Sequence, residues 1–366
     1  MSWTGDSRAT SERARLAARD ALDAHLRETV RWHFSPETGT PVWLEFARTC
    51  GFDPIRDIGG LDDLVRCFPS FDGERLRSDP HERWIPRAFQ GRPFTIFETG
   101  GTTGMPKQRI GWDDYKRDYE RFSATLPEAS FPRGGYWLMV GPTGPRRLRL
   151  AIEHLANFRG SSCYFVDLDP RWVKKRIAAG DGAGAKAYMA HVVEQAALLL
   201  RHRSIDVVFT TPRLLEALGD ELSLADAGVK GVLCGGTEIS PQTARFLVEE
   251  VLERRVALVP VYGNTLMGLA ACDPDTLARN YSITYHAPEP FAVLRVTDPA
   301  DARRLVDYDA RGRVELTTLT RELFLPRFLE RDEAIRRPPC ARWPWDGVGE
   351  VRPFEEPGVR IIEGVY

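Results

Sequence analysis

Residues 99–107 combine glycine, threonine and lysine in a pattern that suits phosphate binding. The segment reads Thr99-Gly100-Gly101-Thr102-Thr103-Gly104-Met105-Pro106-Lys107 and follows a short apolar run. Its glycines allow the backbone to turn sharply and to point N–H groups at an anion, while the threonine hydroxyls and the lysine add donors and charge. The spacing fits neither G-x-x-x-x-G-K-[ST] nor G-x-G-x-x-G. We therefore predict a phosphate-binding loop of another type, with an ordinary surface turn as the alternative.

The segments around this loop alternate between apolar and amphipathic stretches. Leucines 16, 22 and 26 and Val30 predict a helix over the first ~30 residues, with Ser11 as its N-cap. Further on, helical stretches separate five apolar runs, and residues 178–185 are predicted to be a flexible break. The runs are YWLMV (136–140), CYFVDL (163–168), DVVFTT (206–211), KGVLCGG (230–236) and VALVPVYG (256–263). This alternation predicts an α/β fold with a mostly parallel sheet and crossover helices.

Four regions are predicted along the chain. Short strands with polar turns appear from about residue 280, as in FAVLRV and GRVELTTL, and predict antiparallel pairing. The last residues contain two tryptophans and an apolar ending, which favours a tail docked on the protein. The predicted regions are a helical and loop-rich lead-in (1–93), an α/β core (94–280), a β-rich subdomain (281–340) and the docked tail (341–366).

Composition excludes several classes of protein. The chain has 366 residues, of which 43% are hydrophobic and 28% charged, and its net charge is −2. These values are typical of a globular protein and remove the electrostatic drive of a general nucleic-acid binder. No run approaches the ~20 apolar residues of a membrane span, and the polar N-terminus does not resemble a signal peptide. Six dispersed cysteines without a C-x-x-C pair favour reduced thiols, no zinc site and a cytoplasmic location.

Several motifs together resemble the adenylate-forming superfamily, which includes acyl-CoA synthetases and peptide-synthetase adenylation domains. The loop at 99–107 is similar to T-S-G-T-T-G-x-P-K and departs from it chiefly at Gly100. Further similarities follow in the family's order, and the one at 316–322 resembles the phenylacetate-CoA ligase branch. They are T-P-R-L-L-E-A-L (211–218), G-G-T-E-I-S (235–240), Y-G-N-T (262–265), L-T-T-L-T-R-E (316–322) and 327–332 in place of R-Y-R-T-G-D. The implied fold is the large N-terminal domain of such an enzyme without its mobile C-terminal domain.

The resemblance implies a reaction and a role for each motif. A substrate carboxylate would attack the α-phosphate of ATP, with Mg²⁺ present, to give an acyl adenylate and pyrophosphate. Positioning and charge stabilisation would then supply most of the acceleration. Asp332 would bind the ribose, and Lys107, Thr102 and Thr103 would be catalytic. The phosphates would contact Thr99, Gly100, Gly101, Thr102, Thr103, Gly104 and Lys107; adenine would contact Gly235, Gly236, Thr237, Tyr262, Gly263, Asn264 and Thr265; and the acyl group would contact Gly141, Pro142, Thr143 and Gly144.

Two departures from the family pattern bear on catalysis. Leu266 stands where the family has a glutamate that helps to bind Mg²⁺, and an apolar side chain cannot ligate this cation. Magnesium would then be held by ATP oxygens, by water or by another carboxylate, with Glu98 and Glu238 as unranked choices and no assigned protein ligand. The family's C-terminal lysine also has no counterpart, because 34 residues follow Asp332 and the last lysine is Lys230. A CoA-ligase reaction is therefore less expected than adenylation. Arginines that could replace this lysine, or form a solvated basic face, are Arg331, Arg336, Arg337 and Arg342.

The substrate is predicted to be a small aromatic or heteroaromatic acid. Aromatic residues are frequent around 131–137, and flat rings suit aromatic and glycine-lined walls. His154, on the helix after the acyl-pocket segment, is interpreted as a helix-surface residue. The chain most resembles the short phenazine-carboxylate-adenylating enzymes, which implies hand-over of an aryl adenylate to a separate reductase or transferase in natural-product biosynthesis. A homodimer is common among relatives.

Two alternatives to an adenylating enzyme are considered. The first is a degenerate protein that binds nucleotide or acyl adenylate, which Leu266 and the absent lysine favour. The second is an acyl transferase resembling the acyl-protein synthetases, which needs a nucleophilic cysteine near the C-terminus. Cys340 is the only late cysteine, and its neighbouring arginines favour the thiolate.

Overall fold

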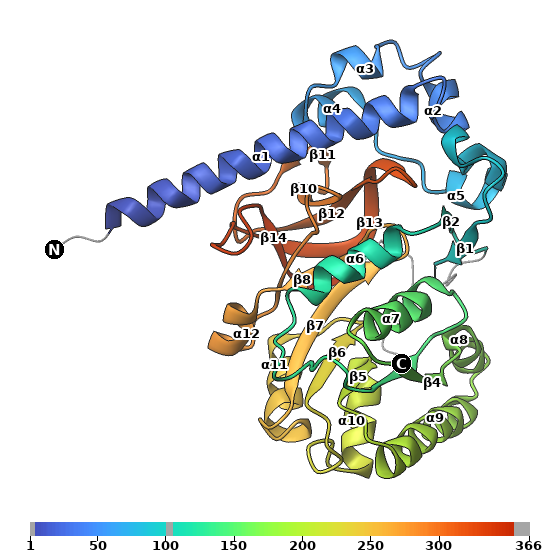
Figure 1. Ribbon diagram of the computed structural model, residues 1–366, viewed down its shortest axis with the longest axis vertical. Coiled ribbons are helices and arrows are strands. Elements are labelled where there is room, and N and C mark those ends of the chain that lie inside the picture. The colour runs from blue at the N-terminus through green and yellow to red at the C-terminus, as the bar shows by residue number, and fades with distance from the viewer. Residues whose placement is uncertain (1–3, 100–104, 355–366) are drawn as a thin grey trace. The chain divides into compact units, whose positions relative to one another are not determined.

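The computed structural model describes residues 4–99 and 105–354, with side chains from residue 12 onward (Figure 1). These residues divide into two compact units. The first unit contains residues 4–96, 107–114 and 284–354, and the second contains 97–99, 105–106 and 115–283. Each unit is thus built from segments that lie far apart in the sequence. The four-part division expected from the sequence stays a prediction.

The first unit begins with one long helix and several short ones. Helix α1 spans Thr4–Phe34, which confirms the predicted N-terminal helix. It begins seven residues before Ser11, so the prediction that Ser11 is its N-cap is wrong. Polar residues before Ser11 continue the helix instead of capping it. The following helices are α2 (Pro41–Phe46), α3 (Pro54–Asp57), α4 (Leu61–Cys67), α5 (Arg75–Ser78) and the 3-10 turns η1 (His81–Trp84) and η2 (Arg87–Phe89).

Antiparallel strands form the sheet of the first unit, in the order β11-β10-β12-β13-β14-β9. The predicted antiparallel pairing after residue 280 is therefore confirmed. The edge strand β11 is exposed and charged, which protects an open edge from pairing with another chain. The strands are β9 (Thr284–His286), β10 (Ala292–Asp298), β11 (Asp301–Leu305), β12 (Arg311–Leu319), β13 (Phe324–Arg337) and β14 (Gly347–Pro353), and β2 (Gln108–Gly111) also lies in this unit.

An aromatic cluster joins α1 and the short helices to β13. Trp43 packs edge-on against Phe324, with ring centroids 5.1 Å apart, and donates its indole N–H to the Phe324 carbonyl oxygen. Phe34 and Phe68 complete the cluster around Phe324. Burial of such large rings is the main stabilising contribution here.

The second unit contains a parallel sheet whose strands run in the order β7-β6-β5-β3-β4, with β8 antiparallel to β7. Every residue of β3, β5 and β6 is buried, because helices cover both faces of a parallel sheet. The predicted strand runs are therefore confirmed. Their bounds are β3 (Trp137–Gly141), β4 (Cys163–Asp167), β5 (Val207–Thr210), β6 (Gly231–Gly235), β7 (Ala257–Asn264) and β8 (Gly268–Cys272).

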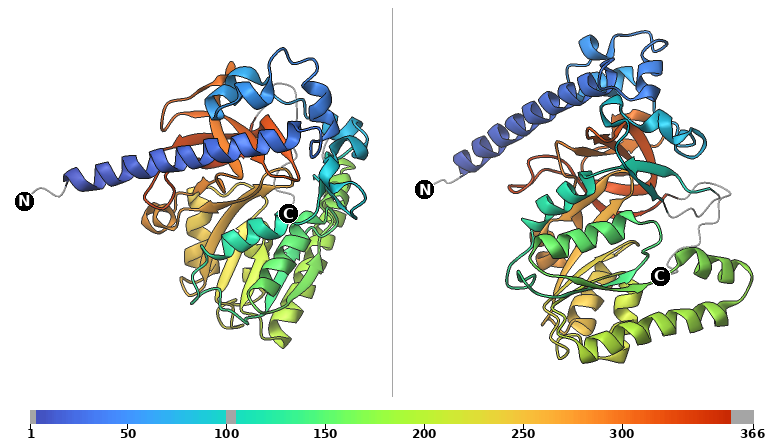
Figure 2. Two further views of the ribbon diagram at one scale, coloured as in Figure 1. Left: turned by 45° about the horizontal axis from the view of Figure 1, so that its top comes forward. Right: turned by 45° about the vertical axis from the view of Figure 1, so that its right-hand side comes forward.

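Crossover helices connect these strands on two faces. The chain passes from β3 to β4 on one side and then returns to β5 on the other side of β3, so right-handed crossovers place α7 opposite α9, α10 and α11. Figure 2 shows α7 and α9 on opposite sides of the strands. The helices are α7 (Arg147–Phe158), α8 (Pro170–Ala178), α9 (Gly182–His202), α10 (Pro212–Glu221), α11 (Pro241–Phe246), the π-helical turn η3 (Leu247–Val251) and α12 (Pro274–Asn280).

The predicted break at 178–185 is only partly present. Helix α9 already begins at Gly182, because the Asp181 carboxylate caps it by accepting the Gly184 N–H at 2.8 Å. Two further elements, β1 (Thr95–Glu98) and α6 (Asp114–Ser123), cross the boundary between the units in sequence. No helix in the described residues is long and apolar enough to span a bilayer.

Candidate functional site

Four loops of the second unit leave the same edge of its sheet. They follow the carboxyl ends of β3, β5, β6 and β7, at Gly141, Thr210, Gly235 and Asn264. Strand order reverses between β3 and β5, since the chain leaves β3 for one neighbour and later returns for the other. Ligands of open α/β sheets bind outside the carboxyl ends of the strands at such a reversal. The predicted acyl segment 141–144 and the predicted adenine residues therefore share one edge of the sheet.

Glu98 connects three of the segments at this edge. Its backbone N–H donates to the Pro145 carbonyl oxygen at 3.3 Å, and its own carbonyl oxygen accepts the Thr265 hydroxyl at 3.0 Å. Its carboxylate accepts Arg171 Nη2 at 2.8 Å. Arg171 also approaches the Thr99 carbonyl oxygen at 3.5 Å. The start of the glycine-threonine loop is thus fixed beside both the 141–147 loop and the adenine motif.

Of that loop, the structure describes Thr99 and residues 105–107. Thr99 is half-buried in the second unit, directly after the Glu98 connection. Gly100, Gly101, Thr102, Thr103 and Gly104 lie outside the described residues, and their predicted roles stay predictions.

The loop from 141 to 147 is held by a series of short-range bonds. Thr143 donates its N–H and its hydroxyl to the Asp167 carboxylate at the end of β4, at 3.0 and 2.6 Å. The Arg147 N–H returns to the Pro145 carbonyl oxygen at 3.0 Å and closes a three-residue turn around Arg146. Gly141 is buried and leaves only ordinary contacts near its Cα, while Gly144 is open to solvent. The predicted acyl residues therefore belong to an ordered loop.

The turn at 235–237 requires glycine at two positions: at Gly235 because the neighbouring strand lies close to its backbone, and at Gly236 because its φ is positive. A Cβ on Gly235 would lie 2.7 Å from the Val261 carbonyl oxygen of the neighbouring strand. Gly236 has a φ of +95°, a region that side chains strongly disfavour. Thr237 follows them, half-buried. This turn lies beside the Y-G-N-T motif because Gly235 pairs with Val261, the residue before Tyr262.

The Y-G-N-T motif forms the connection between β7 and β8. Asn264 Oδ1 accepts the backbone N–H groups of Leu266 and Met267 at 2.8 and 2.9 Å. Gly263 faces the carbonyl oxygen of Gly268, which is 2.2 Å from the position of a Cβ. Tyr262 is half-buried. Leu266 is only 2% exposed, so its apolar side chain packs inside the protein.

Two threonine hydroxyls at the end of β5 have no hydrogen-bond partner in the described part of the chain. Thr210 is fully buried, and Thr211 is 2% exposed. Thr211 is the N-cap residue of α10, yet its side chain makes no capping bond. Such hydroxyls carry a desolvation cost, and the sequence predicted no ligand contact for either of them, although Thr211 begins the motif at 211–218.

Lys107 and Asp332, the other two predicted nucleotide-binding residues, belong to the first unit. Asp332 is part of β13, and Lys107 contacts Phe328 of the same strand. The Lys107 ammonium group lies 4.3 Å from the Phe328 ring centroid. Burial lowers the pKa of the Lys107 ammonium group, and the nearby charges of Arg331 and Arg77 act in the same direction. Asp332 is half-buried beside Pro353 of β14, in a stretch where the pairing with β12 is irregular. Bulged strands often redirect side chains at functional sites.

Other residues of the matched motifs have structural roles. Arg327 is 2% exposed; its Nε donates to Glu315 at 3.0 Å and its Nη1 donates to the Val65 and Phe68 carbonyl oxygens. Glu322 accepts three consecutive backbone N–H groups, from residues 112–114, at 2.7–2.9 Å. It therefore caps the start of α6, a role that the sequence did not reveal.

The late arginines and Cys340 can now be placed within the first unit. Arg336 pairs with Asp346 at 2.7 Å, and Arg337 pairs with Asp309. Arg342 lies over the Trp343 ring, and Arg331 is exposed. Cys340 Sγ lies 4.0 Å from His286 Nε2, and the buried His286 ring stacks on Trp343 at 4.9 Å.

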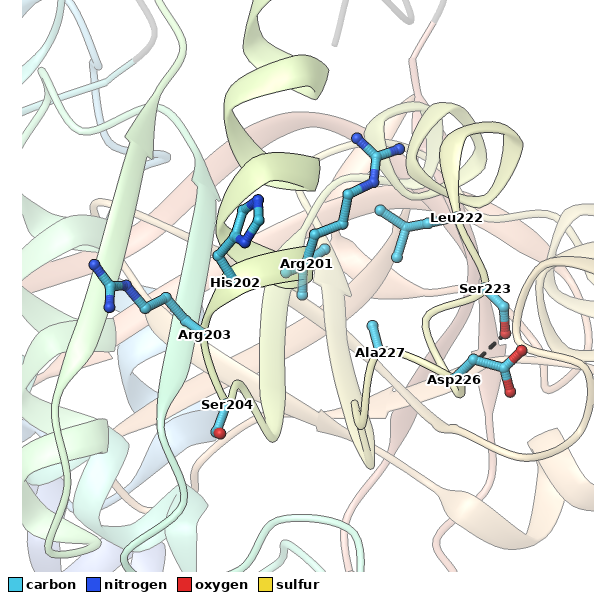
Figure 3. Close-up of a pocket in the computed structure, with 9 residues that line it drawn as sticks. Arg201, His202, Arg203, Ser204, Leu222, Ser223, Asp226 and Ala227 are labelled. Carbon is cyan, nitrogen blue, oxygen red and sulfur yellow. Dashed lines mark hydrogen bonds between the residues drawn. The ribbon is translucent and has the colours of Figure 1, made fainter.

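His154 and one cavity are not part of the group of loops described above. His154 is half-buried, and its Nε2 forms a hydrogen bond with a Glu120 carboxylate oxygen at 2.8 Å, so it is a hydrogen-bonded helix residue more than a solvated one. A cavity of about 580 Å³ lies at the opposite edge of the sheet, where residues 200–204 precede β5 and 222–227 precede β6 (Figure 3). It is therefore separate from the four loops described above.

Comparison with known proteins identifies the fold. No protein-family profile and no curated protein matches the sequence. Among solved structures, 2-hydroxyisobutyryl-CoA ligase in complex with 2-HIB-AMP and CoA, in the thioesterification state, superposes with a TM-score of 0.63 at 18% identity, over 88% of this chain and 64% of that ligase. An open conformation of the same ligase, also with 2-HIB-AMP and CoA, gives 0.62 at 16% identity over 91% and 73%.

These similarities show the fold. The chain has the α/β fold of the matched part of 2-hydroxyisobutyryl-CoA ligase, so the predicted fold class, that of the large N-terminal domain of adenylate-forming enzymes, is confirmed. It spans 64% of the length of that ligase in the first comparison, which is less than two thirds.

Proposed function

We propose that this protein activates a small carboxylic acid by adenylation with ATP, giving an acyl adenylate and pyrophosphate. The observation that carries the proposal is the hydrogen bonding of Glu98, which ties the start of the glycine-threonine loop to the 141–147 loop and to Thr265. One edge of one sheet thereby presents a predicted phosphate loop, a predicted acyl segment and a predicted adenine turn. An enzyme of this kind needs all three close together, because it acts by positioning the acid against the α-phosphate.

The residues at this edge fit parts of ATP. Gly235 and Gly236 form the turn proposed to contact the adenine, and Tyr262 follows Val261, the strand partner of Gly235. Lys107, Thr102 and Thr103 are proposed to act on the phosphates, and Asp332 on the ribose. Each of these roles follows from the motif that contains the residue.

Magnesium would neutralise charge on the triphosphate when bound. Leu266 offers it no ligand, and Glu238 is exposed at the adenine turn. Glu98 directly precedes the loop, and its carboxylate Oε2 forms an ion pair with Arg171 Nη2 at 2.8 Å. We therefore propose that triphosphate oxygens and water supply most of the Mg²⁺ ligands. Glu98 directly precedes the glycine-threonine loop and is the carboxylate that would contribute a further ligand.

The substrate and the pathway are proposed from the resemblance alone. An aromatic or heteroaromatic acid is the proposed substrate, as for the phenazine-type enzymes of the phenylacetate-CoA ligase-like branch. A separate reductase or transferase in natural-product biosynthesis would take the acyl group. A cytoplasmic location and a homodimer are part of the same proposal.

Pyrophosphate exchange tests the proposed function directly. Purified protein is incubated with ATP, Mg²⁺, labelled pyrophosphate and a panel of aryl, heteroaryl and aliphatic acids. We expect label to enter ATP only with an aromatic or heteroaromatic acid. Tight ATP binding without exchange for any acid would contradict adenylation and would favour the degenerate nucleotide-binding protein.

One observation favours a second candidate function, acyl transfer through the protein itself. The 4.0 Å contact between Cys340 Sγ and His286 Nε2 places a base beside a thiol. The thiolate would attack the carbonyl carbon of an acyl adenylate, AMP would leave, and a thioester would remain on Cys340. Labelled acid that stays on denatured protein, and is lost in Cys340→Ser, is the expected result. Equal labelling of that variant would contradict it.

A further inference from the structure

Two consecutive arginines, Arg146 and Arg147, end the 141–147 loop, and they differ in burial. Arg147 is 4% exposed and pairs with Asp118 at 2.7 Å inside the second unit. Arg146 is exposed, and its side chain has no hydrogen-bond or ion-pair partner among the described residues. One arginine therefore anchors the loop, and the other presents its charge at the surface of the loop.

The backbone of Arg146 is held in a disfavoured conformation. Its φ is 72° and its ψ is −43°, close to those of a rare and strained three-residue turn. The bond from the Arg147 N–H to the Pro145 carbonyl oxygen, at 3.0 Å, closes this turn. Strain of this kind at a residue other than glycine concentrates at functional sites. Arg146 is also the N-cap residue of α7, and it makes no side-chain cap.

The position of Arg146 relates it to the predicted phosphate loop. The carbonyl oxygen of Pro145, the residue before it, accepts the Glu98 N–H, and Thr99 opens the glycine-threonine loop one residue later. The other cation at this place, Arg171, is paired with the Glu98 carboxylate. Arg146 is thus an exposed arginine without a charge partner among the described residues, and its backbone lies next to the contact that precedes the loop. Anionic oxygens bind arginine through charge-assisted hydrogen bonds.

We propose that Arg146 is a catalytic residue whose guanidinium group binds the β- and γ-phosphate oxygens of ATP and the departing pyrophosphate. This inference rests on the proposed function, and no sequence motif indicated it. The guanidinium would offset the negative charge that develops on pyrophosphate as the acid attacks the α-phosphate. It would act on ATP and pyrophosphate but not on AMP, which lacks both distal phosphates.

The experiment compares Arg146→Ala, Arg146→Lys and Arg146→Gly with the wild type. The matched control is Arg203→Ala, which removes an exposed arginine at the opposite edge of the same sheet. We expect Arg146→Ala to lower the pyrophosphate exchange rate about 100-fold and to weaken ATP binding about tenfold, while AMP binding stays within about twofold. Arg146→Lys should recover part of the rate, and the control should match the wild type.

A stability measurement separates function from folding. Arg146→Gly relieves the backbone strain, so we expect a higher melting temperature together with the same loss of exchange. Exchange within about threefold of wild type in Arg146→Ala would overturn the inference. If the wild type shows no exchange with any acid, the proposed function fails, and the ATP and AMP affinities still decide: equal losses for both ligands, or no loss, would overturn the role of Arg146.

Discussion

Glu322 belongs to one of the motifs found in the sequence, and its side chain stabilises the fold. Its side chain is 4% exposed, and its two carboxylate oxygens accept three backbone N–H groups at the start of α6. A helix start leaves such donors without partners, and a negative charge there is favourable.

Replacement of Glu322 should destabilise the protein strongly. Glu322→Ala leaves three donors without an acceptor, so we expect the free energy of unfolding to fall by about 3 kcal/mol. The control is the adjacent Arg321→Ala, whose side chain is 56% exposed and pairs with Glu28 on the surface. We expect that control to cost less than about 1 kcal/mol. Urea denaturation measures both, and equal effects would show that Glu322 is not a structural cap.

At the scale of elements, the approach of β6 to β7 determines the shape of the turn at 235–237, the predicted adenine turn. Gly235 lies against the Val261 backbone, and Gly236 adopts a conformation that glycine favours. The spacing between two paired strands is nearly constant, so a side chain at Gly235 can only be accommodated by a shift of one strand.

Gly235→Ala should therefore impair both stability and nucleotide binding. Its Cβ would lie 2.7 Å from the Val261 carbonyl oxygen, and we expect a loss of about 2–3 kcal/mol together with weaker ATP binding. Gly182→Ala is the control, because no atom lies within 4 Å of its Cβ and the residue opens α9. We expect that variant to be neutral or slightly stabilised. Thermal unfolding and equilibrium ATP binding provide the two measurements, and unchanged ATP affinity in Gly235→Ala would count against the proposed turn.

For the molecule as a whole, two ionisable groups of the first unit oppose each other in the pH dependence of stability. Burial raises the pKa of Glu289 to about 8, and the negative charge of Asp346 acts in the same direction. Arg19 opposes this shift, while Asp23 supports it. Burial lowers the pKa of His33 to about 4. The folded state binds the Glu289 proton more tightly than the unfolded chain and the His33 proton less tightly.

The sign of each contribution follows from linkage. His33 removes stability as the pH falls from about 6.5 to 4, and Glu289 removes stability as the pH rises from about 4.5 to 8. Above pH 6.5 only the Glu289 contribution of this pair still changes. We expect the free energy of unfolding to decrease by about 2 kcal/mol between pH 6.5 and 8.

Glu289→Gln should remove that decrease, because glutamine does not titrate. Chemical denaturation of both proteins at several pH values gives the slope directly. Glu28→Gln, an exposed carboxylate paired with Arg321, is the control and should leave the slope above pH 6.5 unchanged. A wild-type slope that persists in Glu289→Gln would assign the effect to another group.

The sequence by itself determined the elements of the second unit and the nature of its loops. Apolar runs of strand length alternate with amphipathic stretches, and this pattern depends only on which face of each element is buried. The glycines at 235–236 predicted an adenine-contacting turn, and only the structure shows that Gly235 lies against the Val261 backbone. The helix start at Ser11 was predicted wrongly because local capping preference does not decide where a polar helix begins.

Only the tertiary structure decided which residues meet. Glu98 bonds Thr265 across 167 residues and Arg171 across 73, and no local pattern encodes such partners. Arg146 and Arg147 are identical in type and adjacent, yet one is buried in an ion pair and the other is exposed. The same holds for Arg321 and Glu322, which share a motif but differ in burial. Side-chain environment depends on the packing of distant strands and helices, and sequence spacing carries no information about that packing.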